Sequence, residues 1–195
     1  MRALPLVLLL ALGCSQDDIV VPEHEAAADA LLLHVRGDAW DDVFAQAPEA
    51  SYIRVDGANA VPVDSVPNPL PSFLSDEPPY LDAAARDQYA TSVVGDTVVA
   101  GRSARVVEAR FVPDGRRSQP IRYVRAAVAP ERGGVLAIEV RREMSSILFD
   151  EQSHFTASLA SGARGLIPGT SSIHATTNVL MGESQASSIR WERRP

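Results

Sequence analysis

The feature that most constrains this fold is a series of strand-like segments in the second half of the chain. From residue 87 onward apolar and polar residues alternate with a period of two, and Gly, Pro and Asp residues interrupt the pattern at short intervals. Short breaks join antiparallel neighbours, so the pattern predicts a meander of hairpins, with Gly95-Asp96 as its first turn. The predicted strands cover residues 88–94, 97–100, 104–112, 121–129, 135–141 and 147–159, with a weaker pair at 172–179 and 187–191.

The strand predicted at 147–159 has two clearly different faces. The apolar face carries Ile147, Phe149, Phe155, Ala157 and Leu159, and the polar face carries Asp150, Gln152, His154, Thr156 and Ser158. Glu151 and Ser153 interrupt the apolar face, where polar groups need partners or an opening. We expect His154 to be solvated, and likewise the arginine pair 141–142 at the end of the preceding strand.

Two amphipathic helices are predicted before the meander. The first covers residues 23–36, and the second follows Asp38 and places Trp40 and Phe44 on one face. Two short strands, 51–55 and 60–64, flank a turn. Six of the fourteen prolines then fall between residues 62 and 79, which predicts a long surface loop. The apolar residues of this loop are Leu70, Phe73 and Leu74. They either close over the core or face a partner or a bilayer.

The first fourteen residues predict where the chain is located. Arg2 precedes an uncharged run at 4–12, which is shorter than the about 20 residues of a membrane-spanning helix. Small residues then lead to Cys14, the only cysteine. This stretch resembles a bacterial lipoprotein signal, which implies cleavage after residue 13 and lipidation of Cys14. The alternative is a buried N-terminal helix with a free core cysteine.

The domain prediction follows from that signal. Residues 1–13 are the signal peptide, 14–22 a lipidated tether and 23–195 a single domain. In similar lipoproteins Asp after the cysteine retains the protein at the inner membrane, so Ser15 favours the periplasmic face of the outer membrane. The remaining chain has 17 arginines against 25 acids, a net charge of −8, which argues against nucleic-acid partners.

The charge is uneven along the chain. Residues 15–80 contain 13 acids and two arginines, whereas the remainder is mildly basic. This division indicates either internal complementarity after folding or an acidic face for a basic partner.

No catalytic or metal-binding pattern is found in the sequence. The chain has no lysine, which excludes Schiff-base chemistry and the lysine-containing phosphate loop. The four histidines have no short metal-ligand spacing, and the adjacent carboxylates Asp41-Asp42 and Asp150-Glu151 diverge around a helix or across a strand. We therefore expect a non-enzymatic protein without a metal or cofactor.

The strand pattern resembles the envelope carrier superfamily that includes LolA, LolB and RseB. The resemblance rests on residues 97–109, 123–125, 135–140 and 148–155. It implies an α+β fold, in which a curved antiparallel half-barrel has two or three short helices packed on its concave face around an apolar cavity for acyl chains. The candidate cavity lining is Trp40, Phe44, Phe149, Phe155 and Leu159, and Leu70, Phe73 and Leu74 are the candidate partner or membrane loop.

Two functions follow from this resemblance. The first is a lipid-anchored envelope protein that binds acyl chains or lipoproteins in the cavity. The alternative is an interaction or sensor lipoprotein that binds another envelope protein through its sheet or its acidic N-terminal region.

Overall fold

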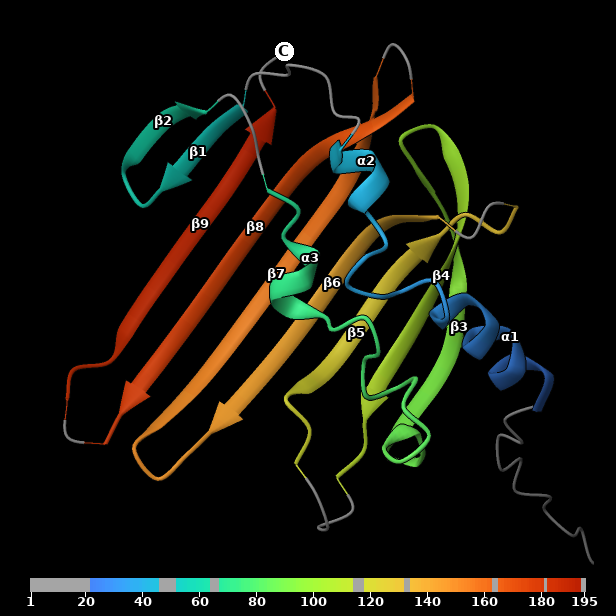
Figure 1. Cartoon of the computed structure of the whole chain (residues 1–195), viewed down its shortest axis with the longest axis horizontal. Helices are drawn as coiled ribbons and strands as arrows, with labels where there is room; N and C mark the ends of the chain where they lie inside the picture. The colour runs from blue at the N-terminus through green and yellow to red at the C-terminus, as the bar shows by residue number, and fades with distance from the viewer. Residues whose placement is uncertain are drawn as a thin grey trace, which may run out of the picture.

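A single antiparallel sheet of nine strands forms the body of the protein (Figure 1). The computed structural model describes residues 22–45, 52–63, 67–113, 118–131, 134–162, 165–180 and 182–193. The spatial order of the strands is β2-β1-β9-β8-β7-β6-β5-β4-β3. The strands are β1 (Tyr52–Asp56), β2 (Asn59–Val63), β3 (Tyr89–Val99), β4 (Arg102–Phe111), β5 (Ile121–Val128), β6 (Val135–Ser145), β7 (Phe149–Gly162), β8 (Gly165–Val179) and β9 (Gln185–Arg193).

The predicted antiparallel meander is confirmed from β3 to β9, where each strand pairs with the next. Among the described strands β2 and β3 lie at the two ends of the order, so the curved sheet is open and not a closed barrel. Three α-helices accompany it, namely α1 (Pro22–Leu32), α2 (Asp41–Ala45) and α3 (Leu70–Phe73), together with a 3-10 turn, η1 (Arg86–Gln88).

The predicted turn at Gly95-Asp96 is wrong. β3 continues through these residues because β4 pairs with both of its halves, from Tyr89 opposite Phe111 to Val99 opposite Arg102. The irregularity lies between Val93 and Gly95, where one extra residue makes a β-bulge. The first true turn of the meander is Ala100-Gly101, and both residues have positive φ, 52° and 73°.

The sheet brings distant parts of the chain together at β1. The hairpin predicted at 51–55 and 60–64 is confirmed as β1 and β2, but β1 also pairs with the C-terminal strand β9, with Tyr52 opposite Arg193. The sequence pattern of the hairpin gave no indication of this second neighbour.

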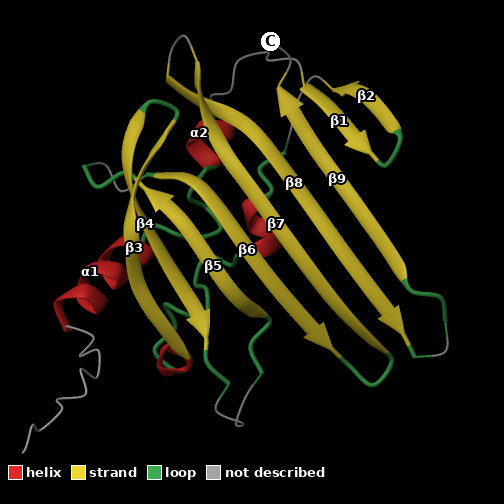
Figure 2. Cartoon of the chain, turned by 180° about the vertical axis from the view of Figure 1, so that it is seen from behind, coloured by secondary structure: helices red, strands yellow, loops and turns green. Residues whose placement is uncertain are grey.

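The hydrophobic core lies between one face of the sheet and the helices, which we call the helix-covered face (Figures 1 and 2). α1 contributes Ala28 and Leu32, and Trp40 lies just before α2. Trp40 is fully buried, and its Nε1 donates a hydrogen bond to the Val135 carbonyl, 2.7 Å away. Alternate residues of the sheet complete this core, including Val107, Val124, Ile138, Val140, Phe155, Ala157 and Leu159.

The proline-rich segment closes over this core. Leu70, Phe73 and Leu74 are all buried, and the Phe73 ring stacks on Phe155 with centroids 4.5 Å apart. Of the two alternatives for these side chains, the structure therefore has the inward one. Their burial does not support a role as an exposed partner or membrane loop.

No described helix is long and apolar enough to cross a membrane. The signal and tether, including Cys14, lie outside the described residues.

Candidate functional site: a groove on the helix-free face

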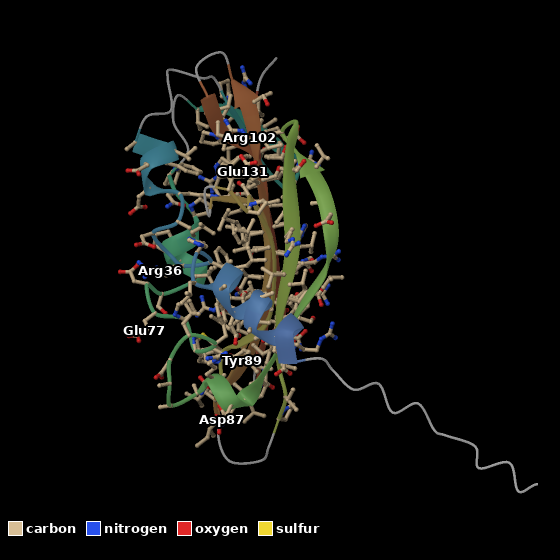
Figure 3. The ribbon with its side chains drawn as sticks, turned by 90° about the vertical axis from the view of Figure 1, so that its right-hand side faces the viewer. Arg36, Glu77, Asp87, Tyr89, Arg102 and Glu131 are labelled. Atoms are coloured by element: carbon tan, nitrogen blue, oxygen red, sulfur yellow. The ribbon has the colours of Figure 1, made fainter. Side chains whose placement is uncertain are left out.

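The opposite face of the sheet carries none of the described helices and is turned toward the viewer in Figure 2. We call it the helix-free face. Seen edge-on, α2 and α3 lie on one side of the sheet and the β3–β4 hairpin bows outward on the other (Figure 3). Arg102, at the start of β4, lies beside Glu131 near the upper end of that view.

The hairpin bends over the helix-free face because of the bulge in β3. Before the bulge Val93 pairs with Val107 and packs against the main core; after it Thr97 pairs with Ala104, which belongs to a second small cluster. The extra residue thus turns the second half of β3 toward the helix-free face. The bent hairpin is fastened by the Ser161 hydroxyl, which donates to the Ala100 carbonyl at 2.7 Å.

Between the bent hairpin and the sheet lies a groove of about 390 Å³. We call it the open groove. Its floor includes the small side chains of Ala127, Ala137 and Ser158, which leave the space that larger residues would fill. Its lining is Thr97, Val99, Val106, Arg125, Ala127, Ala137, Ile138, Glu139, Thr156, Ala157, Ser158 and Thr170.

Polar and charged residues form two rows across the strands of the helix-free face, and Arg125 and Glu139 of the first row line the open groove. In the first row Glu108, Arg125 and Glu139 are register partners on β4, β5 and β6. In the second row, Arg110, Tyr123, Arg141, His154 and His174 follow one another from β4 to β8. Each strand thus presents residues i and i+2 on the helix-free face.

Glu108 is the centre of one cluster in these rows. The Tyr123 hydroxyl donates to Glu108 Oε1 at 2.6 Å, and Arg125 Nε lies 3.6 Å from the same oxygen. Arg110 and Arg141 lie over the Tyr123 ring, 5.2 and 5.1 Å from its centroid. Burial, the hydrogen bond to Glu108 and the nearby carboxylates raise the pKa of Tyr123 to about 12, so the phenol is a neutral donor at pH 7.

Glu139 is the centre of the second cluster. Its Oε1 accepts from Arg141 Nη2 at 2.7 Å and lies 3.0 Å from His154 Nε2. The side chains of Arg141 and His154 stay 59% and 43% exposed, so the prediction that they are solvated agrees with the structure, but their shared contact with Glu139 was not predicted. An arginine thus pairs with each carboxylate, Arg125 with Glu108 and Arg141 with Glu139.

A repeated sequence pattern indicates these rows, although predicting the strands does not require it. Residues 108–110, 123–125 and 139–141 each place a polar or charged side chain two positions from an arginine. The period of two predicts that each pair shares a face, but the register that aligns the pairs is set by the turns and the two irregularities in β5–β6 pairing.

The predicted cavity residues lie on the helix-covered face and not in the open groove. Trp40, Phe155 and Leu159 are buried in the core, and Phe44 is half-buried, with its ring 6.1 Å from that of Trp40. Phe149 is half-buried at the start of β7, opposite Val179 and away from that cluster. Their role as the lining of an acyl-chain cavity stays a prediction.

Within the described residues, no three His, Cys, Asp or Glu side chains are placed to hold a metal ion.

Comparison with known proteins adds little to this site. No family model and no curated protein matches the chain. A chain in the solved MucA/MucB complex of Pseudomonas aeruginosa is similar over 86% of this chain and 94% of its own length, at 10% identity and a TM-score of 0.31. A likeness at this score carries no argument about fold or function.

Proposed function

We propose that this chain is a non-enzymatic lipoprotein of the bacterial envelope that binds a protein partner in the open groove. Lipidated Cys14 would hold it at the periplasmic face of the outer membrane, as its N-terminal sequence predicts. The observation that carries the proposal is the groove itself: about 390 Å³ with a floor of small residues, beside two rows of side chains that are already held by one another.

The composition of the groove favours a polypeptide over a lipid. Val99 and Val106 offer apolar contact, while Arg125, Glu139 and Thr156 add charged and hydroxyl groups along the same space. Protein interfaces combine an apolar centre with such a polar rim. Because Glu108 and Glu139 pair with the neighbouring arginines, little side-chain conformational entropy would be lost on binding.

The acidic N-terminal region is the weaker of the two predicted protein-binding surfaces. Asp38 pairs with Arg36 at 2.8 Å, Asp29 pairs with Arg86, and Asp41 accepts a hydrogen bond from Asn68 at 2.8 Å. Of these contacts only the pair of Asp29 and Arg86 joins the acidic part of the chain to the basic remainder, and it supports internal complementarity at that place.

The test is site-specific photocrosslinking in living cells. A photoreactive amino acid replaces Thr97, on the hairpin side of the groove and not on its floor, or, as a control, Thr176, which is exposed on β8. We expect one discrete crosslinked protein from position 97 and none from position 176.

A second variant makes this test specific for the groove. Ala137→Phe fills the groove and should abolish the crosslink, whereas Thr176→Phe should leave it unchanged. Equal thermal stability of the two variants excludes misfolding as the cause. A crosslink that survives Ala137→Phe would overturn the assignment of the partner to this groove.

Acyl-chain binding on the helix-covered face is the second candidate, supported by the way α3 is attached. Arg142 Nη1 donates to the Ser72 carbonyl at 2.7 Å, and the Phe73–Phe155 stack holds the other side of this four-residue helix. Displacement of α3 would open space beside Phe155, inside the half-barrel that the resemblance implies. Full-length protein without co-purifying lipid and without a displaceable fluorescent fatty-acid probe would rule this candidate out.

A further inference from the structure

An exposed apolar corner of the sheet lies far from the open groove. The β6–β7 turn carries Ile147 and Leu148, which are 89% and 69% exposed, and the end of β8 carries Leu180, which is 71% exposed. The two segments are adjacent, because the Leu180 amide donates to the Leu148 carbonyl at 3.1 Å and Phe149 lies opposite Val179. We call this set, completed by Val179 and the partly exposed Met144, the apolar corner.

The apolar corner combines three residues at the β6–β7 turn, Met144, Ile147 and Leu148, with two at the end of β8, Val179 and Leu180, and all five are exposed. Large contiguous apolar patches mark interaction sites, whereas single exposed apolar residues do not. Val98 is a useful contrast, because it is equally exposed at 68% but lies in the second half of β3, on the hairpin that borders the groove.

The charges around the apolar corner define its partner. No arginine lies in residues 143–151 or 177–185, and the acids there are Glu143, Asp150, Glu151 and Glu183. Two arginines approach the corner from outside these ranges: Arg142 Nη2 lies 3.9 Å from Met144 Sδ, and Arg122 pairs with Glu143 at 3.0 Å. The four acids still outnumber these two arginines. An anionic surface is therefore repelled, and the free energy of binding must come from apolar burial. The hydrocarbon boundary of an electrically neutral lipid layer satisfies both conditions.

The proposed anchor lies within reach of the same layer. From Cys14 to Pro22 the chain spans at most about 26–29 Å. α1 packs on β3 and β4, so three to four strand spacings, or about 14–19 Å, separate it from the turn between β6 and β7 across the sheet, in addition to any offset along the strands. In Figure 1 the N-terminal end of α1 lies at the lower right and the β6–β7 turn at the lower left, so one plane below the sheet can meet both the anchor and the turn.

We propose that the apolar corner inserts into the membrane that holds Cys14, so that the sheet contacts the bilayer at two points. This inference rests on the lipid anchor of the proposed function. It fixes an orientation in which the lower ends of β6–β9 face the membrane and the end of the sheet that carries the β3–β4 turn points away from it.

The test uses the mature lipidated chain in phosphatidylcholine vesicles. Acylated Cys14 is the only natural cysteine, so Leu148→Cys or Val98→Cys can be labelled alone with an environment-sensitive maleimide dye. We expect blue-shifted emission and quenching by nitroxide lipids at position 148 but not at position 98. Adding phosphatidylglycerol should weaken the effect at 148.

Three results would overturn the proposal: a dye at 148 that stays in water, equal quenching at both positions, or a blue shift without lipid that grows with protein concentration, which would mean that a second copy covers the corner. Failure of the anchor is recognised separately. If wild-type and Cys14→Ser chains distribute alike between membrane and soluble fractions, the lipidation is wrong and the two-point contact is wrong with it.

Discussion

Ala100 is the residue whose backbone fits its position least well. Its φ of 52° lies in the left-handed region, where an L-residue with a Cβ is disfavoured by about 1–2 kcal/mol and where Asn is better tolerated. The pair Ala100-Gly101 forms a two-residue hairpin turn with both φ values positive, the turn for which Asn-Gly is the favoured sequence. Ala100→Asn should therefore raise the free energy of unfolding by about 0.5–1 kcal/mol in urea denaturation.

Gly101→Ala is the matched change for this turn. It introduces a Cβ at φ 73° and should lower stability by about 1 kcal/mol. If both substitutions had the same sign, the strain would not lie in this turn.

Trp40 joins the segment between α1 and α2 to the sheet by a buried hydrogen bond. Trp40→Phe removes the donor to the Val135 carbonyl and part of a fully buried ring. We expect a loss of about 2–3 kcal/mol in the free energy of unfolding, which combines a buried unpaired carbonyl with a small cavity. The half-buried Trp191 gives the control, and Trp191→Phe should cost less than 1 kcal/mol. Equal losses would mean that the bond to Val135 adds nothing to stability.

At the scale of the elements, the tip of the β3–β4 hairpin is joined to β7 across the groove by a side-chain hydrogen bond, in addition to the packing of Val99. Ser161→Ala removes the hydrogen bond to the Ala100 carbonyl and should release the tip of the hairpin from β7. Amide hydrogen exchange of residues 99–102 should become several-fold faster, while the global free energy of unfolding changes by less than about 1 kcal/mol.

The control for this prediction is a hydroxyl that bonds elsewhere on the sheet. Ser172→Ala removes a 2.7 Å contact with the Thr156 hydroxyl between β7 and β8, away from the hairpin tip. Exchange at 99–102 should not change in this variant. If it changed as much as in Ser161→Ala, the effect would be a general loosening of the sheet.

The elements could be predicted from the sequence wherever their pairing is local. The two helices, the N-terminal hairpin and the order of strands from β3 to β9 follow from periodicity and turn residues, because each of these strands pairs with its sequence neighbour. Gly95-Asp96 misled the prediction because a bulge and a turn use similar residues, and the difference lies in whether the partner strand continues past them.

The open groove could not be predicted from local patterns. It requires the bulge in β3, the contact between Ser161 and Ala100 and the registers of six strands, β3 to β8, at once. Short runs such as 139–141 indicated which side chains share a face, but not that Glu139 meets His154 from the next strand. The register also decided that Phe155 lies in the core and Phe149 outside the cluster.

At the scale of the whole molecule, the burial of the tyrosines predicts that the free energy of unfolding falls at alkaline pH. Burial is the largest cause that raises the pKa of all four, Tyr52, Tyr80, Tyr89 and Tyr123. The pKa of a tyrosine in the unfolded chain is about 10, and below that pH the contribution of each buried phenol to stability is fully present. The contribution is lost as the pH rises through the higher pKa values of the folded protein, because the unfolded chain then ionises more readily.

The measurement for this prediction is tyrosinate absorbance near 295 nm. At pH 10.5 we expect little absorbance from the native protein and more than half of the full signal in denaturant, with midpoint unfolding shifting to lower urea as the pH rises further. Native tyrosines that ionise with a midpoint near 10 would contradict the burial of these phenols.

The pairing of β1 with β9 sets the order in which this molecule is completed during synthesis. Tyr52 pairs with Arg193, which is synthesised 141 positions later. β1 and β2 therefore leave the ribosome long before their neighbour β9 exists. The strands from β3 to β8 can pair one after another because short loops connect them. The pairing of β1 with β9, in contrast, closes a loop that contains most of the chain. A nascent or C-terminally shortened chain therefore exposes two unpaired strand edges, on β1 and on β8, and is most prone to aggregate at that stage.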